Sequence, residues 1–205
     1  MKNKHLILAA RFLSALFRPY YIPIVVFITL FTITYLNILP VVYKLSVLSL
    51  VYCFTVLLPQ ITIFFYRRMK GWSSYELRHR KNRVIPYIIF IASYATCFHM
   101  MREFHMPGYM GGIIVGALMI QIICTFLNIW WKISTHSAGA GGLIGALMAF
   151  SLLFHFNPTW WLCLCILLSG LVNSSRMILR QHSLAQVISG TVIGAICGFV
   201  GIMFT

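Results

Sequence analysis

The sequence predicts an all-α protein, a polytopic membrane helix bundle of six or seven transmembrane helices that follows an N-terminal interfacial amphipathic segment. Three observations lead to this prediction. Of the 205 residues, 60% are hydrophobic and only 9% are charged, a balance typical of a polytopic membrane protein and not of a soluble domain. Apolar runs near the roughly 20 residues that a helix needs to cross a bilayer recur along the chain. Residues 1–18 combine four basic side chains with leucine, isoleucine and phenylalanine, and they are too short to span.

The predicted bundle occupies residues 19–205, and each of its helices corresponds to one apolar run. Pro23, Pro86 and Pro158 stand at predicted first turns, where proline is tolerated. Several runs are short for a span, so the prediction is six or seven helices. The runs cover residues 21–39, 45–66, 86–101, 109–131, 139–156, 158–172 and 184–204.

The charge balance restricts the chemistry. Sixteen lysines and arginines face only Glu76 and Glu103, and the chain has no aspartate. Sites for Mg²⁺ or Ca²⁺, and two-metal hydrolases, need several carboxylates, so we expect neither a metal nor a cofactor. The excess of +14 indicates anionic partners, which are lipid headgroups, a phosphorylated substrate, or both. Nucleic acid is not an expected partner, because the basic residues stand between membrane spans. Nothing in the sequence predicts the oligomeric state.

Three polar segments follow an even number of predicted spans, so we expect them on the same side of the membrane. They cover residues 67–83, 132–138 and 173–183, and each contains a histidine and at least one lysine or arginine. Their meeting on one face favours a single anion site. The positive-inside rule alone is the alternative explanation for the arginines, but it does not explain His136 and His182.

Three short motifs within these segments resemble the signatures of the type 2 phosphatidic acid phosphatase superfamily. The segment "SRMILRQH", residues 175–182, has the spacing Ser-Arg, five residues, His of the third signature. The segment "ISTH", residues 133–136, resembles the second signature through Ser134 and His136. The segment "RHRKNRVIP", residues 78–86, resembles the first. The resemblance covers about residues 76–201, and the third signature is its most specific part.

This resemblance implies a metal-independent lipid phosphate phosphatase. His182 would attack phosphorus to form a phosphohistidine, and His136 would protonate the leaving group and then activate water. Guanidinium groups suit this chemistry because they stabilise the charge of a transferring phosphoryl group. The phosphate contacts would be Arg176, Ser134, Arg78 and, in place of the family arginine whose position Ile85 occupies, Arg83 or Arg80. Lys132 is either a further phosphate contact or an interfacial anchor.

The substrates that the resemblance implies are a lipid phosphate monoester or a pyrophosphate. These include phosphatidate, phosphatidylglycerol- or phosphatidylinositol-type phosphates, polyprenyl pyrophosphate and lipid A. Two other functions stay open: a non-catalytic binder or carrier of anionic lipids, and an inactive member of the superfamily.

Gln186 stands where the family has an aspartate that orients the nucleophile. Its amide oxygen can accept a hydrogen bond from His182. The sequence "SLAQ", residues 183–186, is also a capping box, in which Ser183 caps the last helix and Gln186 reaches back to it. The residue patterns allow both interpretations.

Two further expectations concern assembly and orientation. Glycines at every fourth position, at Gly190, Gly194 and Gly198 and again at Gly141 and Gly145, predict close packing of the helices that follow His182 and His136. Seven basic residues outside the motifs fall on the predicted active-site side: Lys2, Lys4, Arg11, Arg18, Arg67, Arg68 and Lys70. The positive-inside rule therefore favours a cytoplasmic site in a bacterial inner membrane, with a periplasmic site as the alternative.

Overall fold

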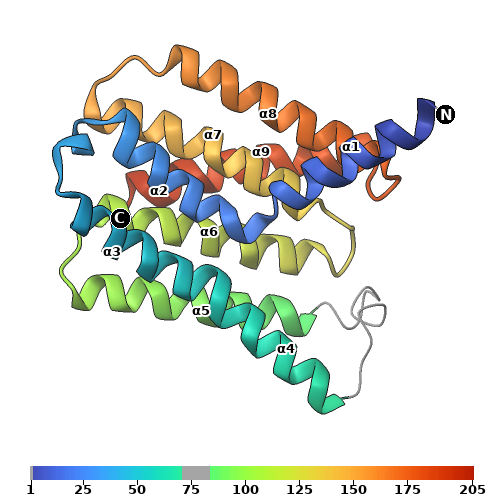
Figure 1. The fold of residues 1–205 in the computed structure, drawn as a ribbon, viewed down its shortest axis with the longest axis horizontal. Coiled ribbons are helices and arrows are strands. Elements are labelled where there is room, and N and C mark those ends of the chain that lie inside the picture. Colours follow the sequence, from blue (N-terminus) through green and yellow to red (C-terminus); the bar gives the residue numbers. More distant parts are fainter. Residues whose placement is uncertain (1, 71–83) are drawn as a thin grey trace.

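The computed structural model describes residues 2–70 and 84–205, and within these ranges the regular structure is helical (Figure 1). The predicted all-α class is therefore confirmed for the described part of the chain. Short 3₁₀ or π segments connect some of the helices, at Pro19–Tyr21, Tyr35–Ile38 and Cys53–Leu57. The α-helices are α1 Lys2–Leu16, α2 Ile22–Ile33, α3 Val41–Tyr52, α4 Leu58–Lys70, α5 Val84–Glu103, α6 Gly108–Leu127, α7 Thr135–Phe154, α8 Thr159–Ile178 and α9 Leu184–Met203.

Five helical stretches in the described residues are long and apolar enough to cross a membrane, which identifies the chain as an integral membrane protein. They are Val41–Met69, Gly108–Leu127, Thr135–Phe154, Thr159–Ile178 and Leu184–Met203. Helix α5 has 20 residues but is not among them. The predicted count of six or seven spans stays a prediction.

The N-terminal segment differs in one respect from the expected interfacial helix. Together, His5–Leu16 and Pro19–Ile33 are long and apolar enough for one broken span, bent by 41° at the connection. Helix α1 also packs against α8, so the segment is attached to the bundle. We call residues 14–21, which turn the chain from α1 into α2, the elbow.

Helix α7 is the central helix of the bundle, and twelve of its 20 residues are buried. It packs against α2, α6, α8 and α9, because its first half consists largely of glycine, alanine and serine. These small residues let other backbones approach closely. The core beside it is formed by large apolar side chains such as Phe27, Leu30 and Phe150, all of which are buried.

The glycine pattern produces the predicted close packing of α7 on α9. A Cβ atom at Gly190 would lie 2.8 Å from the backbone oxygen of Ser134. Cβ atoms at Gly194 and Gly198 would collide with the backbones of Ala138 and Gly142. Backbone therefore lies directly on backbone along the whole interface, which fixes α9 relative to the start of α7.

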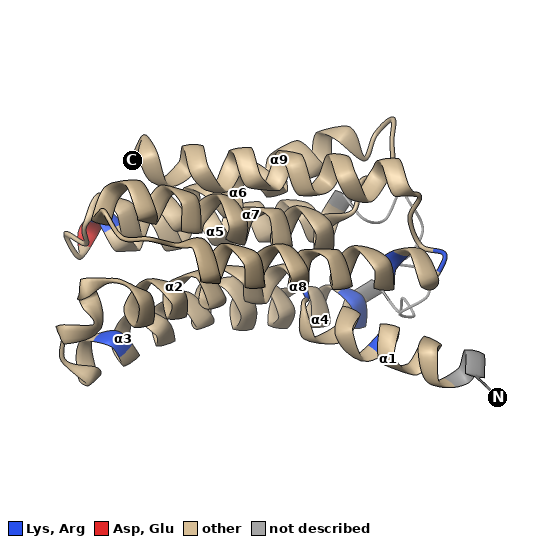
Figure 2. Cartoon of the chain, turned by 90° about the horizontal axis from the view of Figure 1, so that it is seen from above, with Lys and Arg blue, Asp and Glu red and all other residues tan. Residues whose placement is uncertain are grey.

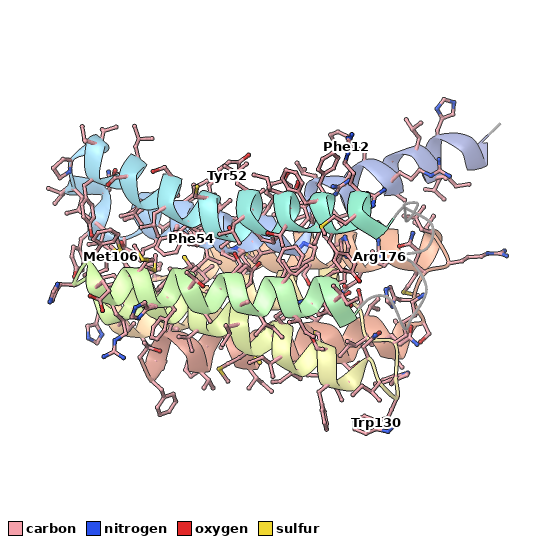
Figure 3. All side chains as sticks on the ribbon, turned by 90° about the horizontal axis from the view of Figure 1, so that it is seen from below. Phe12, Tyr52, Phe54, Met106, Trp130 and Arg176 are labelled. Carbon is pink, nitrogen blue, oxygen red and sulfur yellow. The ribbon has the colours of Figure 1, made fainter. Side chains whose placement is uncertain are left out.

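The connections that carry the second and third motifs lie at the same end of the bundle (Figure 1). Arg176 and Trp130 lie at this end, whereas Met106 lies at the other (Figure 3). The acidic residue of the described chain also lies at the other end (Figure 2), where Glu103 approaches His99 at 4.0 Å. Cations at the motif-bearing end therefore have no carboxylate counterion among residues 2–70 and 84–205.

Candidate functional site

Helix α8 ends in a Schellman-type turn, which leads into the short connection that carries His182. The amide of Gln181 donates to the Arg176 carbonyl at 3.1 Å, and the amide of Arg180 donates to the Met177 carbonyl at 2.9 Å. Arg180 is left-handed, with φ of 51°, a conformation that costs a non-glycine residue about 1 kcal/mol. This reversal places His182 two residues before α9.

The Nδ1 atom of His182 lies 3.3 Å from the backbone oxygen of Lys132 and 3.3 Å from Oε1 of Gln186. Oε1 also accepts the backbone N–H of Ser183 at 3.1 Å, which identifies this amide atom as the oxygen. Both partners of Nδ1 are therefore acceptors, so Nδ1 carries the proton. The lone pair of the neutral ring is then on Nε2.

The two interpretations of Gln186 hold together in the structure. Ser183 and Gln186 form the predicted capping box at the start of α9, and the same amide oxygen faces His182. Gln186 thus caps the helix and contacts the imidazole with one atom. Whether it supports catalysis stays a prediction.

Burial lowers the pKa of His182 from 6.5 to about 4, with smaller contributions from the positive charges of Arg176 and Lys132. The imidazole is therefore neutral at neutral pH. Because the folded pKa lies below the unfolded one, His182 costs stability as the pH falls from about 6.5 towards 4. A bound phosphate dianion would oppose this shift, since an opposite charge favours the imidazolium.

The structure brings His136 and Arg176 to His182 from two other helices. His136 is the second residue of α7 and interacts electrostatically with both Arg176 and His182. Arg176 lies in the last turn of α8 and interacts electrostatically with His182. The imidazole of His136 in α7, the guanidinium of Arg176 in α8 and the imidazole of His182 in the connection between α8 and α9 thus form one cluster.

Ser134 and Lys132 have structural partners. Ser134 is fully buried and caps α7: its Oγ accepts the backbone N–H of Ser137 at 3.3 Å and the Ser137 hydroxyl at 2.8 Å. The Lys132 ammonium is exposed and donates to the Gln181 carbonyl at 3.0 Å, which ties the two connections together. Their assignment as phosphate contacts stays a prediction.

The predicted phosphate contacts of the first motif, Arg78, Arg80 and Arg83, lie outside the described residues. Pro86, which ends that motif, lines an apolar cavity. Within residues 2–70 and 84–205, no three histidine, cysteine or acidic side chains lie together in a way that could hold a metal ion.

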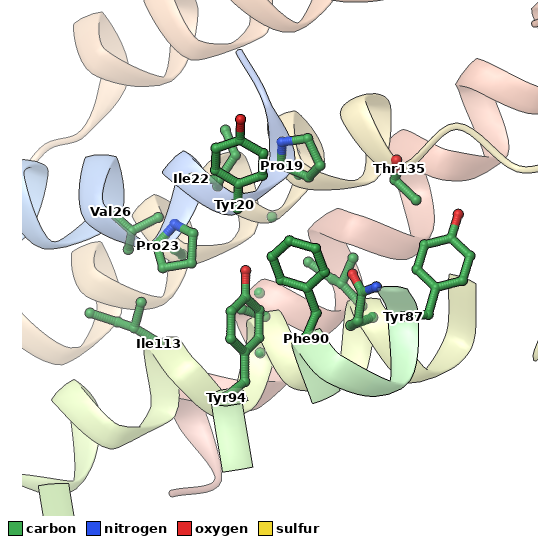
Figure 4. A pocket seen from close by; sticks show the side chains of 18 of the residues that line it. Pro19, Tyr20, Ile22, Pro23, Val26, Tyr87, Phe90, Tyr94, Ile113 and Thr135 are labelled. Carbon is green, nitrogen blue, oxygen red and sulfur yellow. The ribbon is translucent and has the colours of Figure 1, made fainter. Parts of the chain in front are cut away.

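The apolar cavity has a volume of about 110 Å³ and lies between the elbow, α2, α5, α6, α7 and α9. Figure 4 shows Tyr20, Phe90 and Tyr94 on its walls, with Thr135 at one end. Thr135 stands between Ser134 and His136 in the chain, so the cavity reaches the first turn of α7. It gives the histidine cluster an adjoining space that suits hydrocarbon.

Two residues of the site were not predicted from the sequence. The Nη1 atom of Arg176 donates to Oγ of Ser14 at 2.6 Å, and Ser14 is buried. The backbone of Ser14 is also a hydrogen-bond partner of His136, and Arg18 interacts electrostatically with that ring. The sequence indicated only a basic amphipathic segment here, and no motif connects it to the histidines.

Comparison of the chain with family models, with curated proteins and with solved structures finds no match. The proposal below therefore depends on the residues and their geometry.

Variants of Gln186 separate its two contacts. Gln186→Ala removes the capping box, so we expect the free energy of unfolding to fall by about 1 kcal/mol. Gln186→Glu keeps an acceptor for Ser183 and adds a negative charge beside His182, which should raise the pKa of that imidazole. In a pH profile of kcat/KM for phosphate release, the acid limb of Gln186→Glu should then shift to higher pH. An unshifted profile with unchanged melting temperature would show that residue 186 does not act on His182.

Proposed function

We propose that the chain is a metal-independent membrane phosphatase that hydrolyses a lipid phosphate monoester or pyrophosphate through a phosphohistidine on His182. The observation that supports this most strongly is the state of His182. Its Nδ1 proton is directed to two acceptors, so Nε2 keeps a lone pair, and Arg176 interacts electrostatically with the ring. A neutral imidazole with a free nitrogen is the form that attacks phosphorus.

In the proposed reaction, Nε2 of His182 forms a bond to phosphorus while the bond to the leaving alcohol or phosphate oxygen breaks. His136 gives its proton to that oxygen, and the negative charge of the bound phosphate favours the imidazolium form that this step requires. His136 then takes a proton from water, which attacks the phosphohistidine and releases inorganic phosphate and His182. Arg176 stabilises the charge on the phosphoryl oxygens during both steps.

The cavity supports a lipid as the substrate. A soluble phosphate ester would gain nothing from an apolar space beside the cluster, whereas a hydrocarbon chain is stabilised by roughly 0.8 kcal/mol for each CH₂ group that leaves water. An amphiphile with its phosphate at His182 and its tail towards Tyr94 would match both parts of the site.

The distribution of cations favours a cytoplasmic site. Arg67, Arg68, Lys132, Arg176 and Arg180 all belong to the motif-bearing end of the bundle, at the end of α4 or beside the two connections. Positive residues near short connections are retained on the cytoplasmic side. Under this orientation the substrate is presented in the inner leaflet of a bacterial inner membrane.

The test is phosphate release by the purified protein in detergent, with phosphatidate, phosphatidylglycerophosphate and polyprenyl pyrophosphate as substrates. We expect release that EDTA does not reduce. Orthovanadate should inhibit competitively, because it forms a trigonal-bipyramidal adduct that resembles the transferring phosphoryl group. Binding of these lipids without release would instead favour the non-catalytic binder, and a strict requirement for a divalent ion would contradict the mechanism.

A further inference from the structure

The elbow between α1 and α2 lies against the same turn of α7 that carries His136. A Cβ atom at Gly139 would lie 2.9 Å from Ile22 and 3.6 Å from Pro19. Gly139 is three residues after His136, and side chains three residues apart lie on the same face of a helix. The elbow is therefore packed on the His136 face.

The elbow is also connected to Arg176 over a long distance in the chain. Ser14 accepts the hydrogen bond from Arg176 at 2.6 Å, and α1 packs along α8. These contacts anchor the elbow between the two helices that supply His136 and Arg176.

Arg18 is held in a defined position within this elbow. Its Nη1 atom donates to the Tyr20 hydroxyl at 2.7 Å, and its guanidinium carbon lies 6.0 Å from the centre of the Tyr20 ring. Tyr20 itself stacks on Phe90 at 6.1 Å, with an angle of 9° between the rings. The guanidinium remains exposed, so it can reach a ligand while Tyr20 restricts its conformation.

We propose that Arg18 is a phosphate-binding residue of this site, supplied by the N-terminal elbow. Arg18 and Arg176 both interact electrostatically with His136, and Arg176 and Lys132 interact in the same way with His182. Cations gathered around one site attract an anionic ligand. The inference rests on the proposed function only in taking the ligand to be a phosphate group.

Tyr20 links the two halves of the site under this proposal. Its hydroxyl accepts from Arg18, whereas its ring lines the apolar cavity (Figure 4). The position of the phosphate and the entrance for the lipid tail are thereby set by one side chain.

The experiment is calorimetric titration of the full-length protein in detergent with inorganic phosphate near neutral pH. We expect Arg18→Gln to raise the Kd roughly tenfold, because it removes a charge-assisted hydrogen bond to phosphate at an exposed position. Arg18→Lys should recover most of the affinity, and Tyr20→Phe should weaken binding by only a few-fold. Arg11→Gln is the matched control, since Arg11 is an exposed arginine of α1 and leaves the site unchanged.

A salt series separates a phosphate contact from a structural role. If Arg18 contacts phosphate, Arg18→Gln weakens the dependence of Kd on ionic strength, whereas a purely structural defect would leave this dependence unchanged. Equal Kd values for Arg18→Gln and Arg11→Gln would overturn the proposal, as would failure of the wild type to bind phosphate.

Lipid phosphate hydrolysis measured in parallel keeps the two proposals distinguishable. Phosphate binding that depends on Arg18, without hydrolysis of any lipid phosphate, would contradict the proposed function and leave the Arg18 assignment intact. Hydrolysis of a lipid phosphate by the wild type, together with a normal phosphate affinity of Arg18→Gln, would contradict the Arg18 assignment and leave the proposed function intact. A membrane headgroup is distinguished from free phosphate by repeating the titration with vesicles of phosphatidate and of phosphatidylcholine.

Discussion

We expect His182→Ala to lower phosphate release from a lipid phosphate by on the order of 10⁴-fold or more, as removal of an enzymatic nucleophile does. The side chain is half-buried in a connection, and its partners at Nδ1 are the Lys132 carbonyl and the Gln186 amide oxygen. Gln186 retains its bond to Ser183 when the imidazole is absent. The variant should therefore fold and melt nearly as the wild type does.

The measurement is kcat/KM for phosphatidate in detergent, together with a melting curve. His99→Ala is the matched control, because His99 is an exposed histidine near the opposite end of the bundle, beside Glu103. Its activity should be unchanged. Trapping the phosphorylated protein from radiolabelled substrate by rapid quenching supplies a second measurement, and the label should be absent from His182→Ala. Substantial turnover by this variant would show that another group is the nucleophile.

The second large effect concerns stability and comes from the α7–α9 interface. A Cβ atom at Gly194 would collide with the backbone of Ala138 in α7, and no flexible side chain is there to move aside. We expect Gly194→Ala to lower the free energy of unfolding by about 3 kcal/mol, at the upper end of the range for overpacked cores. Turnover should fall as well, because α9 sets the position of His182 relative to His136.

Gly170 in α8 supplies a control for which the expected change in stability has the opposite sign. Its added Cβ would meet nothing within 4 Å, so Gly170→Ala should stabilise the helix by roughly 0.5–1 kcal/mol through propensity alone. Melting temperatures of the two variants in the same detergent, compared with the wild type, test the pair. Equal shifts in the melting temperatures of the two variants would show that the close approach of α7 and α9 does not govern stability.

The sequence was informative about the bundle and about part of the site. Apolar runs and glycine spacing predicted helical elements and their close packing, because both depend on side-chain size and hydrophobicity along a single helix. The motif residues His136, Arg176 and His182 do come together, at the end of the bundle where the second and third motifs lie. The capping box was also predictable, since all of its atoms belong to four consecutive residues.

The elbow was not predictable from the sequence. Ser14 and Arg176 are 162 residues apart, and nothing local to α1 indicates that its serine accepts a bond from α8. The basic residues of α1 are equally typical of a helix on the membrane surface. Only the packing of α1 on α8, and of Pro19 on Gly139, distinguishes Arg18 from the other basic residues of this segment.

The acceptor that Lys132 presents to His182 is a backbone carbonyl, and this has a consequence for how the sequence can vary. Substitution of a side chain cannot remove a backbone oxygen, so the position of the proton on the imidazole is preserved as long as the connection between α6 and α7 keeps its path. The side chain of residue 186 is then not the sole hydrogen-bond partner of the imidazole. A neutral glutamine is therefore sufficient at this position, and we expect substitution of residue 186 to be tolerated more readily than an insertion or deletion before Ser134.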